Sequence, residues 1–169
     1  VGVEVGHGQL HEKLQADERV VCLENLNARE LEGSALAEHA PAEGFDLIVA
    51  DLSFIALSKI VPHLGPWLKP GGRFVFSMTH PAFESPVPGT WIREPKDTAR
   101  IEERRYLAVD GYFDRVAVFW APPGLPLAPS FHRPLRDYFE ALTEAGFLVR
   151  RFEEPYPSKK ALDAHYRIF

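Results

Sequence analysis

The stretch 45–76, FDLIVADLSFIALSKIVPHLGPWLKPGGRFVF, constrains the fold more than any other part of the sequence. It opens with Leu47 to Ala50, a short apolar run without alternation, which is typical of a strand buried on both faces of a parallel sheet. A helical pattern, a tight turn and a second apolar run follow it. This order of strand, helix, turn and strand predicts one winding of an α/β sheet.

The segment 54–68 carries apolar residues at mixed three- and four-residue spacing, as in a helix that packs one face on a sheet. Pro62 and Pro66 are expected to break that helix into short pieces. The KPGG sequence at 69–72 meets the needs of a type II turn, with φ fixed at its second position and free at its third. We expect the next buried strand at 74–77.

Asp51 falls at the carboxyl end of the first of these strands. In open α/β sheets ligands bind in the crevice outside those strand ends, so Asp51 is placed where chemistry can occur. Aspartate is also a preferred capping residue. A functional role and a capping role therefore both stay open for this side chain.

The winding resembles the class I S-adenosylmethionine-dependent methyltransferases. In that class an acidic or polar residue ends the fourth strand, as Asp51 does here, and a Lys-Pro-Gly-Gly turn introduces the fifth. The resemblance implies a Rossmann-like α/β sheet, methyl transfer as the activity and S-adenosyl-L-methionine as the cofactor.

The chain begins with VGVEV at 1–5, which reads as a strand that ends near Glu4. In nucleotide-binding α/β folds an acid at this position accepts hydrogen bonds from the ribose hydroxyls of the ligand. An ordinary strand-end glutamate is the alternative. The glycines at 6 and 8 are not followed by a third, so a dinucleotide fingerprint is rejected. His7 and His11 lack a completing motif and are interpreted as surface histidines, not metal ligands.

A helix at 10–16 and a strand at 19–23 are expected next, with Cys22 as a buried strand residue. The segment VGVEVGHGQLHEKLQADERVVCLENLNARELE, together with FDLIVADLSFIAL, resembles the haemolysin A type of ribosomal RNA 2′-O-methyltransferase over residues 1 to about 60. The cofactor-binding residues that this resemblance implies are Glu4 and Val5 at the ribose, Asn27 and Ala28 near the adenine, and Asp51 with Leu52.

The same resemblance makes Asp51 the acidic member of a Lys-Asp-Lys-Glu catalytic set. His80 stands where the second lysine of that set is expected, and the first lysine and the glutamate have no matching positions. If the accepting atom must lose a proton, His80 is the first candidate for the base and Asp51 the second. A strand-end histidine held by a backbone hydrogen bond is the alternative for His80.

Beyond residue 70, GGRFVFSMTHPAFE and PSFHRPLRDYFEALTEAGFLVRRFEEPYP resemble small-molecule methyltransferases of the group that includes the ubiquinone and menaquinone biosynthesis enzymes. The chain thus carries two resemblances, joined near 56–70. The second resemblance favours a small-molecule acceptor over RNA. Competing hypotheses are a non-catalytic α/β binding module and a nicotinamide-dependent oxidoreductase fragment, the latter disfavoured because the sequence shows no hydride-transfer set comparable to those of such enzymes.

Eleven of the 15 prolines follow residue 80, which marks the region 81–133 as extended segments and turns. We interpret 81–133 as a substrate-covering insertion, with an added strand at 116–120. Its aromatic side chains are candidates for the wall of a pocket, and ordinary packing is the alternative. The candidate substrate-pocket residues are Trp91, Tyr112, Phe113, His132 and Arg133.

The last predicted elements are a helix and a strand. Pro134 is a good first helical residue, and Gly146 is a good C-terminal cap. A strand is expected at 147–152. The first strand of the methyltransferase sheet, with its Asp-x-Gly-x-x-x-Gly turn, and the last strand have no match in the sequence. A truncated chain, inactive alone, is therefore one expectation.

Length and charge are compatible with these predictions. A chain of 169 residues is long enough for one domain, 1–169, that buries about 70% of its unfolded surface. A net charge of −5 gives no global attraction for DNA or other polyphosphates. A single cysteine, and the lack of an apolar stretch of the ~20 residues that span a bilayer, favour a cytoplasmic location without membrane contact. The oligomeric state is not predicted.

Overall fold

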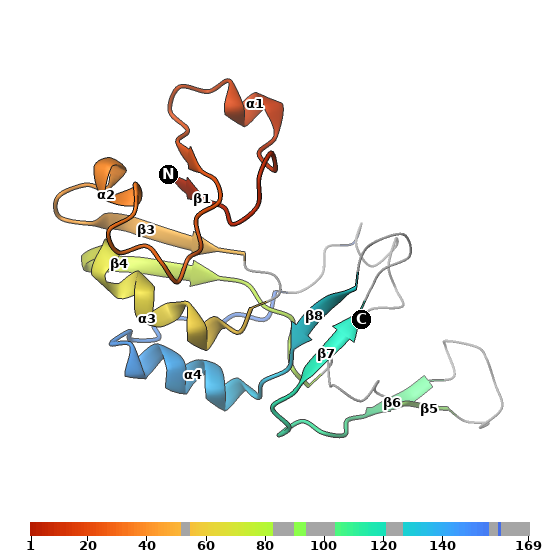
Figure 1. Cartoon of the computed structure of the whole chain (residues 1–169). Coiled ribbons are helices and arrows are strands. Elements are labelled where there is room, and N and C mark those ends of the chain that lie inside the picture. The colour runs from red at the N-terminus through yellow and green to blue at the C-terminus, as the bar shows by residue number, and fades with distance from the viewer. Residues whose placement is uncertain (52–54, 83–89, 94–103, 121–126, 156–158, 160–169) are drawn as a thin grey trace.

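The computed structural model describes residues 1–51, 55–82, 90–93, 104–120, 127–155 and 159 (Figure 1). Within these residues the chain forms a mixed α/β structure with four two-stranded sheets. None of their helices is long and apolar enough to cross a membrane.

Two parallel strand pairs form the first half of the structure. Strand β1 (Gly2–Val3) pairs with β2 (Cys22–Leu23), and β3 (Phe45–Ala50) pairs with β4 (Leu68–Phe76). Parallel pairs require a crossover connection, and the first one contains helix α1 (Glu12–Gln15). The predicted parallel α/β arrangement is confirmed, although the first two strands and their helix are shorter than expected.

The crossover between β3 and β4 is a helix in three pieces, as the prolines predict. The pieces are η1 (Leu57–Lys59), α3 (Val61–Leu64) and η2 (Gly65–Trp67). Pro62 and Pro66 each lie in the first turn of a piece, where a missing N–H leaves no helical hydrogen bond unmade.

The KPGG turn is confirmed at its third position, where Gly71 has a φ of +77°. Strand β4 starts earlier than expected and contains the KPGG segment, because Leu68 already pairs with Phe45, and the register shifts between Phe45 and Leu47. An ion pair between Lys69 and Asp46 joins the two strands at this end.

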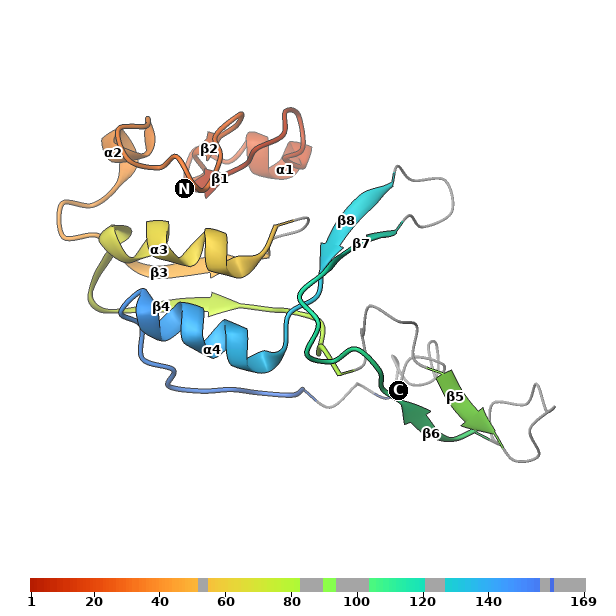
Figure 2. The same cartoon turned by 60° about the horizontal axis from the view of Figure 1, so that its bottom comes forward.

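Helices α3 and α4 (Leu135–Glu144) lie side by side on one face of β3 and β4 (Figures 1 and 2). Ile60 and Leu64 form a buried cluster with Leu31 and with Leu36 of helix α2 (Leu36–His39). Residues of both strand pairs pack against this cluster. They include Val3 and Leu23 from β1 and β2, and Ile48 and Phe74 from β3 and β4.

Helix α4 begins one residue later than the sequence predicts and ends at the predicted cap. Pro134 precedes its first residue, and Gly146 after it has a φ of +83°. The N–H of Gly146 donates to the carbonyl of Thr143, and that of Phe147 to Leu142, which is the Schellman arrangement. Phe147 also packs against buried Leu142, completing the motif.

The strand predicted at 147–152 is wrong. This segment follows α4 without ladder hydrogen bonds. A groove of about 1420 Å³ is lined by residues of β4 on one side and by 147–151 and Glu153 on the other. The groove separates the segment from the edge of β4, and among the residues that the structure describes the segment pairs with no strand.

Two antiparallel hairpins form the second half of the structure. Strand β5 (Thr90–Arg93) pairs with β6 (Arg104–Ala108), and β7 (Ala117–Trp120) pairs with β8 (Ala128–Phe131). The strand expected at 116–120 is therefore confirmed as β7. Both hairpins lie beyond the carboxyl ends of β3 and β4 in the two views (Figures 1 and 2).

Candidate functional site

Three carboxylates follow directly after parallel strands. Glu4 follows β1, Glu24 follows β2 and Asp51 follows β3. Glu4 and Asp51 were predicted from the sequence as site residues, and Glu24 was not. Its place after the apolar run 20–23 is the signal that would have found it.

The Glu4 side chain is half-buried and lies against the loop that follows it. Its Oε1 accepts a hydrogen bond of 2.7 Å from the backbone N–H of Gly6. The backbone of Glu4 also bonds across to the end of β2, because its N–H donates to Leu23 and its carbonyl accepts from Leu26. Glu4 is thus fixed in main chain and side chain. Val5, beside it, is 67% exposed.

Asn27 and Ala28 lie in the loop after β2. The Asn27 side-chain oxygen accepts from the backbone N–H of Arg29 at 3.0 Å, and Ala28 packs against the buried cluster around Ile60. Asn25, earlier in this loop, has a φ of +58°, a left-handed conformation that asparagine tolerates better than most residues.

Asp51 is exposed at the end of β3 and makes no hydrogen bond or ion pair with the other described residues. Its carboxylate is therefore available to a ligand. Leu52, the other predicted residue here, lies outside the described residues. The structure records no contact between Asp51 and Glu4 among the residues it describes.

His80 contacts Ala82 and Glu154. Its Nδ1 accepts from the backbone N–H of Ala82 at 3.2 Å, and its Nε2 lies 3.2 Å from Oε1 of Glu154. Because a backbone N–H only donates, the proton of the neutral imidazole lies on Nε2 and is donated to Glu154. Sequence reasoning missed Glu154, which is far from His80 in sequence and belongs to no motif.

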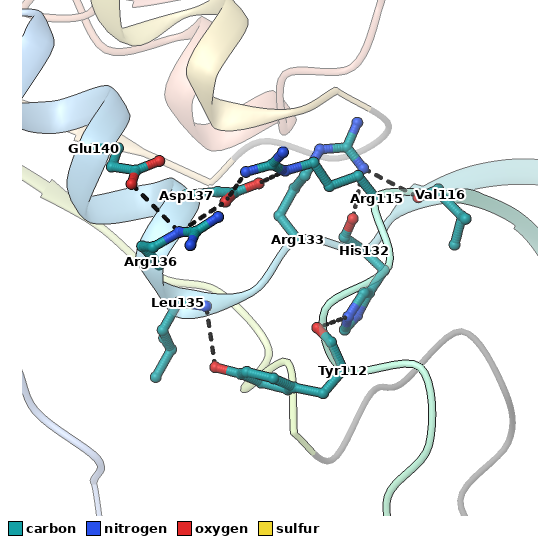
Figure 3. Close-up of polar contacts among 9 residues, drawn as sticks. All are labelled: Tyr112, Arg115, Val116, His132, Arg133, Leu135, Arg136, Asp137 and Glu140. Atoms are coloured by element: carbon teal, nitrogen blue, oxygen red, sulfur yellow. Dashed lines mark hydrogen bonds and ion pairs between the residues drawn. The ribbon is translucent and has the colours of Figure 1, made fainter.

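A polar network at the base of the β7–β8 hairpin involves three of the predicted pocket residues (Figure 3). His132 is only 6% exposed, and its Nε2 lies 2.9 Å from the carbonyl oxygen of Tyr112. The Tyr112 hydroxyl accepts from the N–H of Leu135, at the first residue of α4. Pro134 offers no capping side chain, so Tyr112 satisfies a helix N–H that would otherwise lack a partner.

Arg133 is the third predicted pocket residue in this network, and the remaining two are Phe113 and Trp91. Phe113 is 79% exposed and makes an edge contact with the Tyr112 ring at 5.0 Å between centroids. Arg133 donates from one guanidinium nitrogen to the carbonyls of Val116 and His132. Trp91 belongs to β5, where its backbone pairs with that of Leu107, and its side chain is outside the described part of the structure.

Arg115 and Asp137 join the network to helix α4 through two hydrogen bonds, at 2.5 and 2.8 Å (Figure 3). The Asp137 side chain is 14% exposed. Hydrogen bonding from the Arg115 guanidinium holds the pKa of the Asp137 carboxyl below its ordinary value of 3.8, against the smaller opposing effect of burial. A small pocket of about 170 Å³ lies beside this pair.

Replacing Asp137 with Asn is expected to lower the free energy of unfolding by about 1 kcal/mol at pH 7, since half-exposed Arg115 weakens the pair through solvent screening. A lowered pKa contributes stability that is present above the ordinary value and is lost as pH falls through the lowered one. The difference between wild type and Asp137→Asn should therefore shrink below about pH 4 in urea titrations. Glu140→Gln, which removes an exposed pair with Arg136, is the control, and an equal effect in both variants would contradict the assignment.

The two predicted surface histidines have local partners. His7 Nδ1 lies 2.8 Å from Glu24 Oε2, and His11 Nδ1 accepts from the N–H of Lys13 at the start of α1. Among the described residues no group of three histidine, cysteine or acidic side chains is placed to hold a metal ion.

Solved structures identify the fold. The chain superimposes on an S-adenosylmethionine dependent methyltransferase from Mesorhizobium loti with a TM-score of 0.69 and 22% identity, over 99% of this chain and 72% of that one. A putative S-adenosylmethionine dependent methyltransferase from Listeria monocytogenes gives 0.71 and 20%, over 98% and 73%. The fold is that of the class I methyltransferases, whose cofactor is S-adenosyl-L-methionine.

The chain belongs to the FtsJ-like methyltransferase family, whose model matches residues 1–120. It is 47% identical over 64 residues to the 16S/23S rRNA (cytidine-2′-O)-methyltransferase TlyA of Mycobacterium tuberculosis, covering 38% of this chain and 22% of that protein. It is 33% identical over 116 residues to the putative rRNA methyltransferase YqxC of Bacillus subtilis, covering 65% and 40%. The chain thus spans less than half the length of these curated relatives.

Proposed function

We propose that the protein transfers a methyl group from S-adenosyl-L-methionine to ribosomal RNA. The observation that carries the proposal is the set of carboxylates at the exits of parallel strands, within a chain whose curated relatives act on rRNA. When bound, S-adenosyl-L-methionine supplies a methyl group on a sulfonium. The protein's part is to hold the reactants in line and to exclude water.

The residues after β1 and β2 fit the adenosine part of this cofactor. One carboxylate oxygen of Glu4 accepts from the N–H of Gly6, and the side chain makes no other hydrogen bond or ion pair with the described residues, which leaves Oε2 for the ribose hydroxyls. Asn27 and Ala28 lie in the adjoining loop, where they are assigned to the adenine edge. Val5 and Leu52 complete the proposed cofactor contacts.

Asp51 is the proposed catalytic carboxylate, since it stands exposed at the end of β3 without a competing partner among the described residues. We assign to the region 81–133 the role of covering the acceptor. The position of both hairpins beyond the ends of β3 and β4 supports this role (Figure 2). Trp91, Tyr112, Phe113, His132 and Arg133 are the proposed acceptor-side residues. A cytoplasmic location is part of the same proposal.

A small-molecule acceptor is the second candidate, and the contacts of His80 favour it. A ribose hydroxyl is a weak acid that needs a base to accept its proton. His80, which stands in place of the expected lysine, already accepts from Ala82 through Nδ1 and faces Glu154 through Nε2. An acceptor that loses its proton more easily suits this arrangement.

Transfer of tritiated methyl from S-adenosyl-L-methionine separates the two acceptors. Label in purified 16S or 23S rRNA supports the first candidate, and label only in a protein-free small-molecule extract supports the second. We expect Asp51→Asn to slow transfer by about 100-fold and to weaken cofactor binding much less, as for a group that acts on the reacting atoms at the cofactor site. Glu43→Gln, at the opposite end of β3, is the control, and equal losses in both variants would remove Asp51 from the site.

Replacing Glu4 with Gln is expected to weaken binding of S-adenosyl-L-homocysteine by about tenfold or more, because charge-assisted hydrogen bonds to ribose hydroxyls become neutral ones. Isothermal titration calorimetry measures the change in Kd. Glu12→Gln, an exposed acid in α1, should bind as wild type does. Unchanged affinity in Glu4→Gln would refute the assignment of the ribose to Glu4.

A further inference from the structure

Two carboxylates hold the loop Gly6–Gly8 at its first and last residues. Oε1 of Glu4 accepts from the N–H of Gly6 at 2.7 Å, and Oε1 of Glu24 accepts from the N–H of Gly8 at 2.8 Å. The second oxygen of Glu24 lies 2.8 Å from Nδ1 of His7, within the same loop. Glu24 therefore binds two successive residues of a loop whose first glycine binds Glu4.

The loop lies close to the side chain of Glu4. A Cβ atom at Gly6 would lie 3.1 Å from Oε1 of Glu4 and 3.1 Å from Cγ of Gln9. The carbonyl of Gly6 also accepts from the N–H of Asn25, the residue in the left-handed conformation after Glu24. A shift of the loop away from Glu24 would therefore displace the carboxylate of Glu4.

Burial distinguishes the two partners of the Glu24–His7 pair. The Glu24 side chain is 21% exposed, whereas that of His7 is 80% exposed. The bond from Gly8 engages the main chain of the loop directly, whereas the contact with His7 runs through a side chain that lies largely in solvent. The bond from Gly8 is thus the stronger of the two restraints that Glu24 places on the loop.

We propose that Glu24 is a positioning residue for the cofactor: it holds the Gly6–Gly8 loop so that the carboxylate of Glu4 stays in place for the ribose hydroxyls. The proposal rests on the proposed function, since that function assigns the ribose to Glu4. It adds a residue that acts through Glu4 and does not itself touch the ligand.

A double-mutant cycle with S-adenosyl-L-homocysteine tests this coupling. Glu24→Ala should raise the Kd about tenfold when Glu4 is present and less than about twofold in a Glu4→Gln background, because the ribose contact is then already lost. His7→Ala, which keeps the bond from Gly8, should change the Kd by less than about twofold. Glu24→Gln, which retains an acceptor for Gly8, should restore most of the affinity.

Amide hydrogen exchange supplies a readout without ligand. In the free protein, Glu24→Ala should speed exchange of the Gly6 and Gly8 amides by about fivefold or more, and Glu24→Gln should restore most of the protection. The amides of α4 should be unaffected, which separates a local effect from general destabilisation.

The outcomes distinguish this proposal from the proposed function. The positioning role would be overturned if the fold-losses of affinity from Glu24→Ala and Glu4→Gln multiply in the double variant. Exchange of the Gly6 amide at the wild-type rate in Glu24→Ala would also overturn it. If the wild-type chain binds no S-adenosyl-L-homocysteine, the proposed function fails. Gly6 exchange then decides the positioning role alone: faster exchange in Glu24→Ala keeps Glu24 as the restraint on the loop, and unchanged exchange removes it.

Discussion

The Gly44→Ala variant is expected to lose roughly 3 kcal/mol of unfolding free energy, a large part of the ~5–15 kcal/mol that stabilises a typical domain. Gly44 precedes β3 with a φ of +91°. A Cβ atom there would lie 2.7 Å from the backbone nitrogen of Lys69 and 2.8 Å from the carbonyl carbon of Leu68. Both atoms belong to the main chain of β4, which cannot move aside without disturbing its pairing with β3.

Gly71→Ala is the matched control for this variant. Gly71 also has a positive φ, +77°, but a Cβ atom there would meet nothing within 4 Å. Its expected cost is only the conformational one, about 1 kcal/mol. Urea unfolding followed by circular dichroism measures both variants, and similar losses would show that contact with β4 does not restrict Gly44.

Shortening Ile60 to Ala is the second large expected effect, with a loss of about 3 kcal/mol. Ile60 is 2% exposed and lies in the buried cluster with Leu31, Leu36 and Leu64, against which both parallel strand pairs pack. Removing its outer carbons leaves a cavity at the point where the two pairs share a core, so the loss includes the lost burial and the lost contacts.

Chemical denaturation of a graded series tests this reasoning. Ile60→Val should cost about 1 kcal/mol, since it deletes a single methylene. Leu148→Ala is the control, because Leu148 is 93% exposed, and it should cost less than about 0.5 kcal/mol. Equal losses of unfolding free energy in Ile60→Ala and Leu148→Ala would mean that the buried cluster does not stabilise the fold more than the surface does.

Local sequence signals predicted the elements whose causes are local. The prolines at 62 and 66, the glycine at 71 and the cap at 146 each act through the backbone of their own segment, and each is found where expected. The strand at 147–152 was wrong because a strand depends on its neighbour. The apolar residues of the segment carry no information on the groove beside β4.

In the candidate site, too, features with local causes were predicted and features that depend on the fold were not. Glu4 and Asp51 were predicted because a strand exit is visible in the sequence. Glu154, which contacts His80, and the role of Tyr112 in capping α4 were not, since both depend on residues brought together by the fold. The fold class was predictable from one winding, whereas the partners of His80 and His132 required the structure.

The two parallel strand pairs share a side-chain core but, among the described residues, no ladder hydrogen bonds. Among the described residues, packing and the chain between β2 and β3 therefore connect the part that carries Glu4 to the part that carries Asp51, and the smaller β1–β2 pair should detach before the β3–β4 pair does. A ligand that touches both parts adds its own binding free energy to that connection. If the cofactor contacts both parts, its binding is also the final step in assembling the proposed site.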